Sequence, residues 1–143
     1  MSDAPATTIE LGGRRVEVMG EPGGEAAMAA VIAAVATHDA TCRRALATAL
    51  DDDDVALYVT HHLEHLPGLA AELGVIEAAR PTDAEARAVL ARLYLRTIWS
   101  LDGDHGDGFT VRFDYTLDAR RTDNVLCVTL DRGGGVVGIA MES

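Results

Sequence analysis

The sequence contains no lysine, and all 12 of its basic side chains are arginines. This absence excludes the lysine of a phosphate-binding P-loop, a Schiff-base lysine and a Ser-Lys catalytic dyad. Serine is almost as scarce, because it occurs only at positions 2, 100 and 143. No glycine elbow follows Ser100, so a serine hydrolase is disfavoured. Missing lysine beside abundant Ala, Arg, Gly and Asp is typical of a GC-rich bacterial genome.

Long apolar runs are also missing. The longest, Ala26 to Ala36, is alanine-rich and spans eleven residues, whereas a membrane-crossing helix needs about 20. The first residues show no basic region followed by an apolar stretch, so no secretory signal is visible. We therefore expect a cytoplasmic protein that does not engage a membrane.

Cysteine occurs only twice, and Cys42 and Cys127 stand far apart within apolar periodic segments. In a cytoplasmic chain this pattern predicts two buried free thiols instead of a disulfide. The absence of a Cys-x-x-Cys pair disfavours a thiolate zinc site and a redox motif.

Acidic side chains, in contrast, are abundant, and they give the 143 residues a net charge of −11. A polyanion such as DNA or RNA would be repelled, and no basic stripe or aromatic cluster offsets that repulsion. We therefore do not expect nucleic acid as a partner. An acidic surface suits docking on a basic protein, because complementary fields speed association.

The chain length fits a single domain covering residues 1–143. Two short β-type runs at about 7–18 flank Gly12-Gly13 and predict a hairpin. A helical region follows at about 24–91, and strand-like runs occupy about 92–142. Short turns between those strands indicate an antiparallel meander. The sequence therefore predicts an α+β fold with three or four helices packed on one face of an antiparallel β-meander.

One face of the predicted sheet is expected to be wet. Phe113, Tyr115 and Leu117 alternate with Arg112, Asp114 and Thr116. Because successive side chains point to opposite faces of a sheet, the apolar set predicts a buried face and the polar set a solvated one.

The helical region contains two capping signals. Apolar residues within 25–50 recur at mostly three- and four-residue steps, which predicts two helices or one bent helix. Thr37 or Asp39 is the expected cap of a second helix there. Further along, Thr82 is the expected N-cap of another helix, and Glu85 stands at the position that completes a capping box.

A run of four acids, Asp51–Asp54, directly precedes an apolar segment. The run resembles a metal-binding carboxylate cluster, but aspartates also favour the N-cap and first turn of a helix, where they meet the positive end of its dipole. We interpret the run as a helix start. The helix is expected to reach about Leu66, where Pro67-Gly68 stops it.

The stretch Thr60–Pro67 holds three of the five histidines of the chain. His61-x-x-Glu64-His65 matches the His-x-x-Glu-His pattern of inverzincin metalloproteases. Histidines four apart on a helix point the same way and can share one zinc. In that interpretation Glu64 polarises a bound water, and Glu142 is available as a distant third ligand.

A helical wheel gives a simpler interpretation of the same stretch. The pattern fixes only three positions, and the protease fold that carries it is several times larger than this chain. On the wheel, His62 becomes a part-buried histidine with a hydrogen bond, and its neighbours His61, Glu64 and His65 form a polar flank. The expected apolar face comprises Val55, Tyr58, Val59, His62, Leu63 and Leu66.

Two glycine-rich segments resemble ligand loops but lack the required pattern. Segment 102–108 has Gly106 where an EF-hand needs an acid and Asp107 where it needs glycine, and Phe113 replaces the final glutamate. We expect a solvated hairpin turn there. Gly133–Gly135 is expected to form another turn, because no strand-to-helix context for phosphate binding surrounds it.

The C-terminal sequence carries a family resemblance. FDYTL at 113–117 is a Phe-Asp-Tyr strand, and TDNVLCVTLDRGGGVVGIAMES at 122–143 adds Thr-Asp, an apolar strand, a glycine-containing turn and Glu-Ser. Together with Tyr58-Val59 and His62-Leu63 upstream, this arrangement resembles the uncharacterised bacterial domain of unknown function catalogued as number two thousand and four. The resemblance covers about the last third of the chain and that helix. It implies a small α+β domain without an established activity, and it transfers no catalytic residue.

The sequence predicts no catalytic residue and no cofactor. Our first hypothesis is a non-enzymatic protein-interaction module, in a specific version a toxin-neutralising immunity protein, whose Glu, Asp and Tyr side chains on the exposed sheet face bind a basic partner. The alternative is a metal-binding module or metal-dependent hydrolase that uses His61, Glu64 and His65. A small-molecule pocket between sheet and helices is a third hypothesis. The glycine-rich final hairpin leaves both a monomer and a homodimer open.

Overall fold

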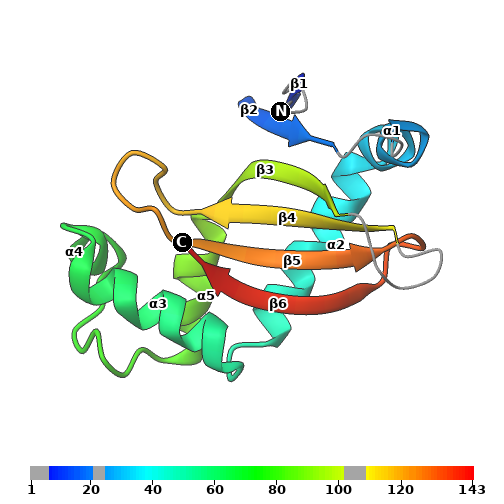
Figure 1. Cartoon of the computed structure of the whole chain (residues 1–143). Coiled ribbons are helices and arrows are strands. Elements are labelled where there is room, and N and C mark those ends of the chain that lie inside the picture. Colours follow the sequence, from blue (N-terminus) through cyan, green and yellow to red (C-terminus); the bar gives the residue numbers. More distant parts are fainter. Residues whose placement is uncertain (1–6, 21–24, 102–108) are drawn as a thin grey trace.

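The chain forms one six-stranded sheet with helices packed against one face, in a computed structural model that describes residues 7–20, 25–101 and 109–143 (Figure 1). The strands follow one another across the sheet in chain order. They are β1 (Thr7–Leu11), β2 (Arg14–Met19), β3 (Tyr94–Leu101), β4 (Thr110–Thr116), β5 (Val125–Asp131) and β6 (Val136–Glu142). The helices are α1 (Glu25–Ala33), α2 (Val35–Thr48), α3 (Asp53–His65), α4 (Leu69–Leu73) and α5 (Asp83–Ala91).

The predicted α+β class is confirmed, but the prediction of a strictly antiparallel meander is wrong at one junction. Strand β2 pairs with β3 in parallel, with Val18 opposite Ile98, while every other neighbouring pair is antiparallel. Parallel neighbours need a long crossover connection, and the helices supply it here. The sheet is therefore mixed, and the N-terminal hairpin extends the C-terminal strands instead of standing apart from them.

The predicted number of helices is also too low, because the described chain contains five. The extra helix is α4, which begins directly after the expected stop at Pro67-Gly68. Helix α3 ends at His65, and Gly68, with a φ of 85°, is the N-cap of α4. Glycine adopts this left-handed conformation at little steric cost. Pro67-Gly68 therefore stops α3 as predicted, but a new helix begins directly after it.

The N-terminal hairpin is confirmed. Gly12 and Gly13 have φ values of 60° and 80°, as required by the two-residue turn that matches the twist of paired strands. Leu11 pairs with Arg14 directly across the turn.

The expected cap of the second helix is wrong. The break between α1 and α2 lies at Ala34, which makes no side-chain capping bond, and both Thr37 and Asp39 lie inside α2. The carboxylate of Asp39 instead accepts hydrogen bonds from Arg43 and Tyr115. The capping rule expects a carboxylate oxygen of Asp39 to accept from a backbone amide, but Tyr115, which is distant in sequence, donates to it instead.

The other helix starts are confirmed. The side chain of Asp52 accepts hydrogen bonds from the amides of Asp54 and Val55, at 2.9 and 3.2 Å, and so caps α3. Thr82 and Glu85 form the reciprocal capping box of α5. Helix α3 buries the expected apolar face, and His62 is more deeply buried than expected, with 2% of its surface exposed.

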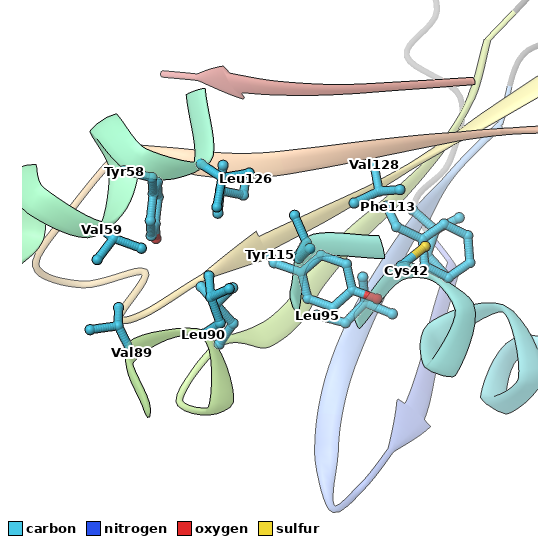
Figure 2. Packing of buried hydrophobic residues seen from close by; sticks show 14 of the residues in the cluster. Cys42, Tyr58, Val59, Val89, Leu90, Leu95, Phe113, Tyr115, Leu126 and Val128 are labelled. Carbon is cyan, nitrogen blue, oxygen red and sulfur yellow. The ribbon is translucent and has the colours of Figure 1, made fainter. Parts of the chain in front are cut away.

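The core lies between the sheet and helices α2, α3 and α5 (Figure 2). Each apolar side chain that is fully buried there stabilises the fold by roughly 1.5–3 kcal/mol. Both cysteines are buried free thiols, as predicted. Figure 2 labels the core residues Cys42, Tyr58, Val59, Val89, Leu90, Leu95, Phe113, Tyr115, Leu126 and Val128.

The opposite face of the sheet is only partly wet, which corrects the expectation from alternation. Arg112 is half-buried, but Asp114 is only 5% exposed and Thr116 is fully buried. Asp114 accepts hydrogen bonds from Trp99 Nε1 at 2.8 Å and from Arg112 Nε at 2.9 Å. The aromatic ring and the guanidinium shield the carboxylate, so a charged residue in the alternation pattern does not guarantee solvent at that position.

The helix-capping assignment can be tested within the aspartate run. Replacing Asp52 with alanine removes the acceptor of two amide groups, so we expect the free energy of unfolding to fall by about 1 kcal/mol. Asp51 is exposed, and Asp51→Ala is a matched control with an expected effect within about 0.5 kcal/mol. Urea denaturation measures both. Equal losses in the two variants would show that Asp52 does not cap the helix.

Candidate functional site

Helix α3 is attached to the sheet by a row of polar side chains at four-residue steps, Asp54, Tyr58 and His62. Residues four apart lie on one face of a helix. Asp54 Oδ2 accepts a hydrogen bond from the amide of Met141 on the edge strand β6, at 3.0 Å. The Tyr58 hydroxyl accepts one from the amide of Leu117, at 3.1 Å. This polar row fixes the rotation of α3 about its own axis.

Two residues of the polar row, Tyr58 and His62, form a closed ring of hydrogen bonds with Thr122 and Asn124 from the turn between β4 and β5. His62 Nδ1 lies 2.7 Å from the carbonyl oxygen of Tyr58, and His62 Nε2 lies 2.9 Å from the Thr122 hydroxyl. Thr122 Oγ1 accepts from the amide of Asn124 at 3.1 Å, and the Tyr58 hydroxyl donates to the Asn124 carbonyl at 3.4 Å. A buried polar group is stable only when its hydrogen bonds are satisfied, and each of these groups has a partner.

The ring sets the protonation of His62. A carbonyl oxygen can only accept, so Nδ1 carries the proton and Nε2 accepts from the Thr122 hydroxyl in the neutral side chain. Burial lowers the pKa of His62 below its ordinary value of 6.5, and the neighbouring His61 and His65 lower it further. Burial also raises the pKa of Tyr58 to about 12. The ring is therefore neutral near pH 7.

The candidate metal ligands do not converge on a metal site. The rings of His61 and His65 lie 4.8 Å apart between centroids, as expected for a helical step of four. Within residues 7–20, 25–101 and 109–143, no group of three or more His, Cys, Asp or Glu side chains is placed to hold a metal ion. Glu64 and Glu142 therefore supply no third ligand, whereas zinc sites use three or four protein ligands.

A shallow polar hollow of about 370 Å³ lies beside the ring. It is bordered by His61, His65 and the turn residues Thr122 and Asp123. His62 and Thr122 bond each other in the wall of the hollow, so neither presents an unpaired polar atom for acid–base work. The hollow therefore offers polar contacts but no assembled catalytic pair.

A second polar cluster joins α2 to the sheet, and sequence reasoning missed it. The Tyr115 hydroxyl donates to Asp39 Oδ1 at 2.6 Å, and Arg43 Nε donates to Asp39 Oδ2 at 3.0 Å. The four-residue spacing of Asp39 and Arg43 was the available signal. Cys42 lies beside this cluster, but burial raises its pKa to about 12. A thiol of that pKa is not a nucleophile near neutral pH.

The remaining candidate segments give two outcomes. The turn at Gly133–Gly135 is confirmed, because Asp131 Oδ1 accepts hydrogen bonds from the amides of Gly133 and Gly135, both at 2.9 Å. The segment 102–108 lies outside the described residues. None of the described helices is long and apolar enough to cross a membrane.

The face of α3 opposite its buried apolar residues forms an outward stripe, which comprises Asp53, Leu57, His61 and Glu64. Asp53 and Glu64 are exposed, and no ion pair of either occurs in the described part of the chain. Leu57 lies between them with 55% of its surface exposed. The stripe therefore presents an exposed apolar side chain between acids that form no ion pair. The helix that carries it is held to the sheet by the polar row.

Comparison with protein-family models, with curated proteins and with solved structures finds no match to this chain. The structure does bring the two segments of the sequence resemblance into contact. The helix that carries Tyr58 and His62 meets the Thr122-Asp123 turn through the hydrogen-bond ring. Membership of the resembled family stays a prediction from the sequence.

The neutral state of His62 predicts the pH dependence of stability. Its pKa is lower in the folded than in the unfolded chain, so the unfolded state binds the proton first as pH falls. We expect stability to be retained above pH 6.5 and to fall below it, by at most about 1.4 kcal/mol per pH unit for this group. The measurement is urea denaturation as a function of pH.

His62→Gln removes this titration and His65→Gln is the matched control, because His65 is exposed on the same helix. His61, Arg121 and Asp123 border the same hollow and remain in both variants. Below pH 6.5, the dependence of the free energy of unfolding on pH should weaken only in His62→Gln. An equal weakening in His65→Gln would contradict the assignment.

The geometry of His61 and His65 predicts weak metal binding. Two imidazoles hold zinc less firmly than the three or four ligands of a protein zinc site, so zinc added in excess should be lost on dialysis. His61→Ala should leave both metal content and melting temperature unchanged. Elemental analysis by mass spectrometry tests this on protein without a histidine tag. Retention of near one zinc per chain, lost in His61→Ala, would restore the metal hypothesis.

Proposed function

We propose that this chain is a non-enzymatic protein-interaction module that binds a basic protein through the outward stripe of α3. The observation that carries the proposal is the exposure of Leu57 between Asp53 and Glu64. Protein interfaces commonly have a buried apolar centre with a polar rim. Leu57 supplies the centre here, and the acids supply a rim that selects a basic partner.

The charge of the whole chain supports the same class of partner. Its net charge is −11, and the ion pairs of the described residues use five acids, namely Asp39, Glu72, Glu77, Asp114 and Asp118. The acids of the stripe are outside these pairs. A surface with this excess of negative charge attracts a basic protein over distances comparable to the screening length, about 8–10 Å at physiological salt.

The surface differs from the one expected from the sequence. Tyr115 is fully buried on the helix-covered face of the sheet, and Asp114 is enclosed by Trp99 and Arg112. These side chains cannot reach a partner on the exposed sheet face. The acidic residues of α3 take over that role in the proposal.

A toxin-neutralising immunity protein is the specific version of this function that we propose. Covering a basic active site requires a rigid acidic surface, because a flexible one would lose conformational entropy on binding. The hydrogen-bond ring behind α3 provides that rigidity. The buried thiols, whose pKa values burial raises, fit a binding role better than a nucleophilic one.

The test begins with capture of partners from an extract of the source organism, followed by reconstitution with the purified partner. We expect a basic partner, a one-to-one complex by calorimetry, and an affinity that falls as salt rises. Leu57→Ala and Glu64→Arg should each weaken binding about tenfold, because they remove the apolar centre and reverse a rim charge.

Glu77→Arg is the control for Glu64→Arg, because Glu77 is exposed, pairs only with the exposed Arg80 and lies outside the stripe. Its complex should keep nearly the affinity of the unaltered protein. Melting curves of all variants separate loss of binding from loss of folding. An acidic partner, or equal weakening by Glu64→Arg and Glu77→Arg, would rule out the proposed surface.

A further inference from the structure

A second hollow, of about 310 Å³, lies away from α3 where the N-terminal hairpin, α2 and the end of α5 meet. Three arginines line it, namely Arg14 from the hairpin, Arg43 from α2 and Arg92 from the end of α5. Tyr94 and Asp39 complete its polar lining. A concentration of guanidinium groups in one hollow is unexpected on a chain with a net charge of −11.

Arg14 occupies a position that the strand pattern assigns to the core. It lies two residues before Val16 and four before Val18, which are both buried in the core. Side chains two apart on a strand share a face, so Arg14 lies on the helix-covered side of the sheet. Arg14 itself is exposed, because it stands at the turn end of this row. Its guanidinium is therefore not part of the core and can meet a ligand in the hollow.

The guanidinium of Arg14 lies over the ring of Tyr94. Arg14 Cζ lies 3.9 Å from the centre of the Tyr94 ring, and the Tyr94 hydroxyl accepts a hydrogen bond from the amide of Ala119 at 2.9 Å. The ring is thus anchored at its far end. Stacking uses the face of the guanidinium and leaves its in-plane N–H groups free for bidentate hydrogen bonds. No ion pair or hydrogen bond of Arg14 occurs among the described residues.

Arg43 is also fixed. Its Nε donates to Asp39 and its Nη1 donates to the carbonyl oxygen of Leu93 at 3.0 Å. Asp39 Oδ1 additionally accepts from the Tyr115 hydroxyl. Both oxygens of Asp39 are therefore engaged, while Arg43 keeps N–H groups beyond these bonds.

The charges that oppose an anion in this hollow are limited. Asp39 is compensated by Arg43, and Arg92 is compensated by Glu72 at 2.9 Å. The carboxyl end of α5 contributes about half a negative charge. Arg14 thus remains as an uncompensated, preoriented guanidinium in the hollow.

We propose that this hollow binds a small molecule through an oxyanion group, either a carboxylate or a phosphate, captured bidentately by Arg14 with Arg43 as the second donor. Planar guanidinium groups match the paired oxygens of both groups. The hollow can accept a small molecule because its volume is at the lower end of ligand sites, about 300–1,000 Å³. This proposal does not depend on the partner of α3.

The test is a two-dimensional NMR titration of the whole, nitrogen-labelled chain with sodium phosphate and, separately, with sodium succinate. Sodium chloride at matched ionic strength is the reference. We expect the Nε–H signals of Arg14 and Arg43 and the amide signal of Gly12 to shift to saturation with at least one oxyanion. Saturation by phosphate alone assigns a phosphate ligand, and saturation by succinate alone assigns a carboxylate ligand.

Arg14→Gln should weaken the saturating interaction about 10- to 100-fold, because it removes charge-assisted hydrogen bonds. Arg44→Gln is the matched control, since Arg44 is exposed beside Arg43 on α2 and does not line the hollow. Arg14→Lys keeps the charge without the fork and should also weaken binding. Shifts that do not saturate, or affinities equal in Arg14→Gln and Arg44→Gln, would overturn the proposal.

Discussion

The hydrogen-bond ring of Tyr58, His62, Thr122 and Asn124 is the constraint on which the placement of α3 depends. Apolar packing alone is non-directional, and a helix that buries Val55, Val59 and Leu63 could rotate by part of a turn at modest cost. The ring does not permit this, because each rotated position leaves buried polar groups without partners, at about 1–3 kcal/mol for each group. Specific orientation thus comes from polar atoms set within an apolar interface.

The same constraint links the inside of the protein to its surface. Asp54 continues the polar row and satisfies the amide of Met141 on the edge strand β6, so α3 also covers part of an edge that would otherwise be open. Further along β6 the pairing skips Val137, which is 58% exposed. An irregular register of this kind discourages a further strand from pairing there. One face of α3 is committed to the sheet, and the outward stripe on its other side is the surface that we propose for a partner.

The sequence predicted the features that depend on local chemistry. Helical periodicity identified the buried face of α3 from Val55 to Leu66. Capping rules identified the aspartate run as a helix start, without choosing the capping residue, and they identified Thr82 with Glu85. Strand alternation likewise identified Phe113 and Tyr115 as core residues. These signals are reliable because the residues that produce them are a few positions apart and act on the same element.

The sequence did not predict the features that depend on distant partners. Predicting the parallel pairing of β2 with β3 requires knowledge of how the whole helical region crosses the sheet. Predicting the role of Asp39 requires knowledge that the Tyr115 hydroxyl donates to it. Asp114 was expected in solvent because alternation ignores Trp99 and Arg112 on neighbouring strands. The hydrogen-bond ring joins residues about 60 positions apart, and no local pattern connects His62 with Thr122.

Amide hydrogen exchange in Tyr58→Phe tests most directly whether the ring holds α3. The substitution keeps the aromatic packing and removes only the hydroxyl, which leaves the Leu117 amide and the Asn124 carbonyl without this partner. We expect amides in α3 and in segment 117–124 to exchange faster together, by roughly tenfold or more. Faster exchange confined to the Leu117 amide, with α3 unchanged, would contradict this expectation and show that apolar packing alone positions the helix.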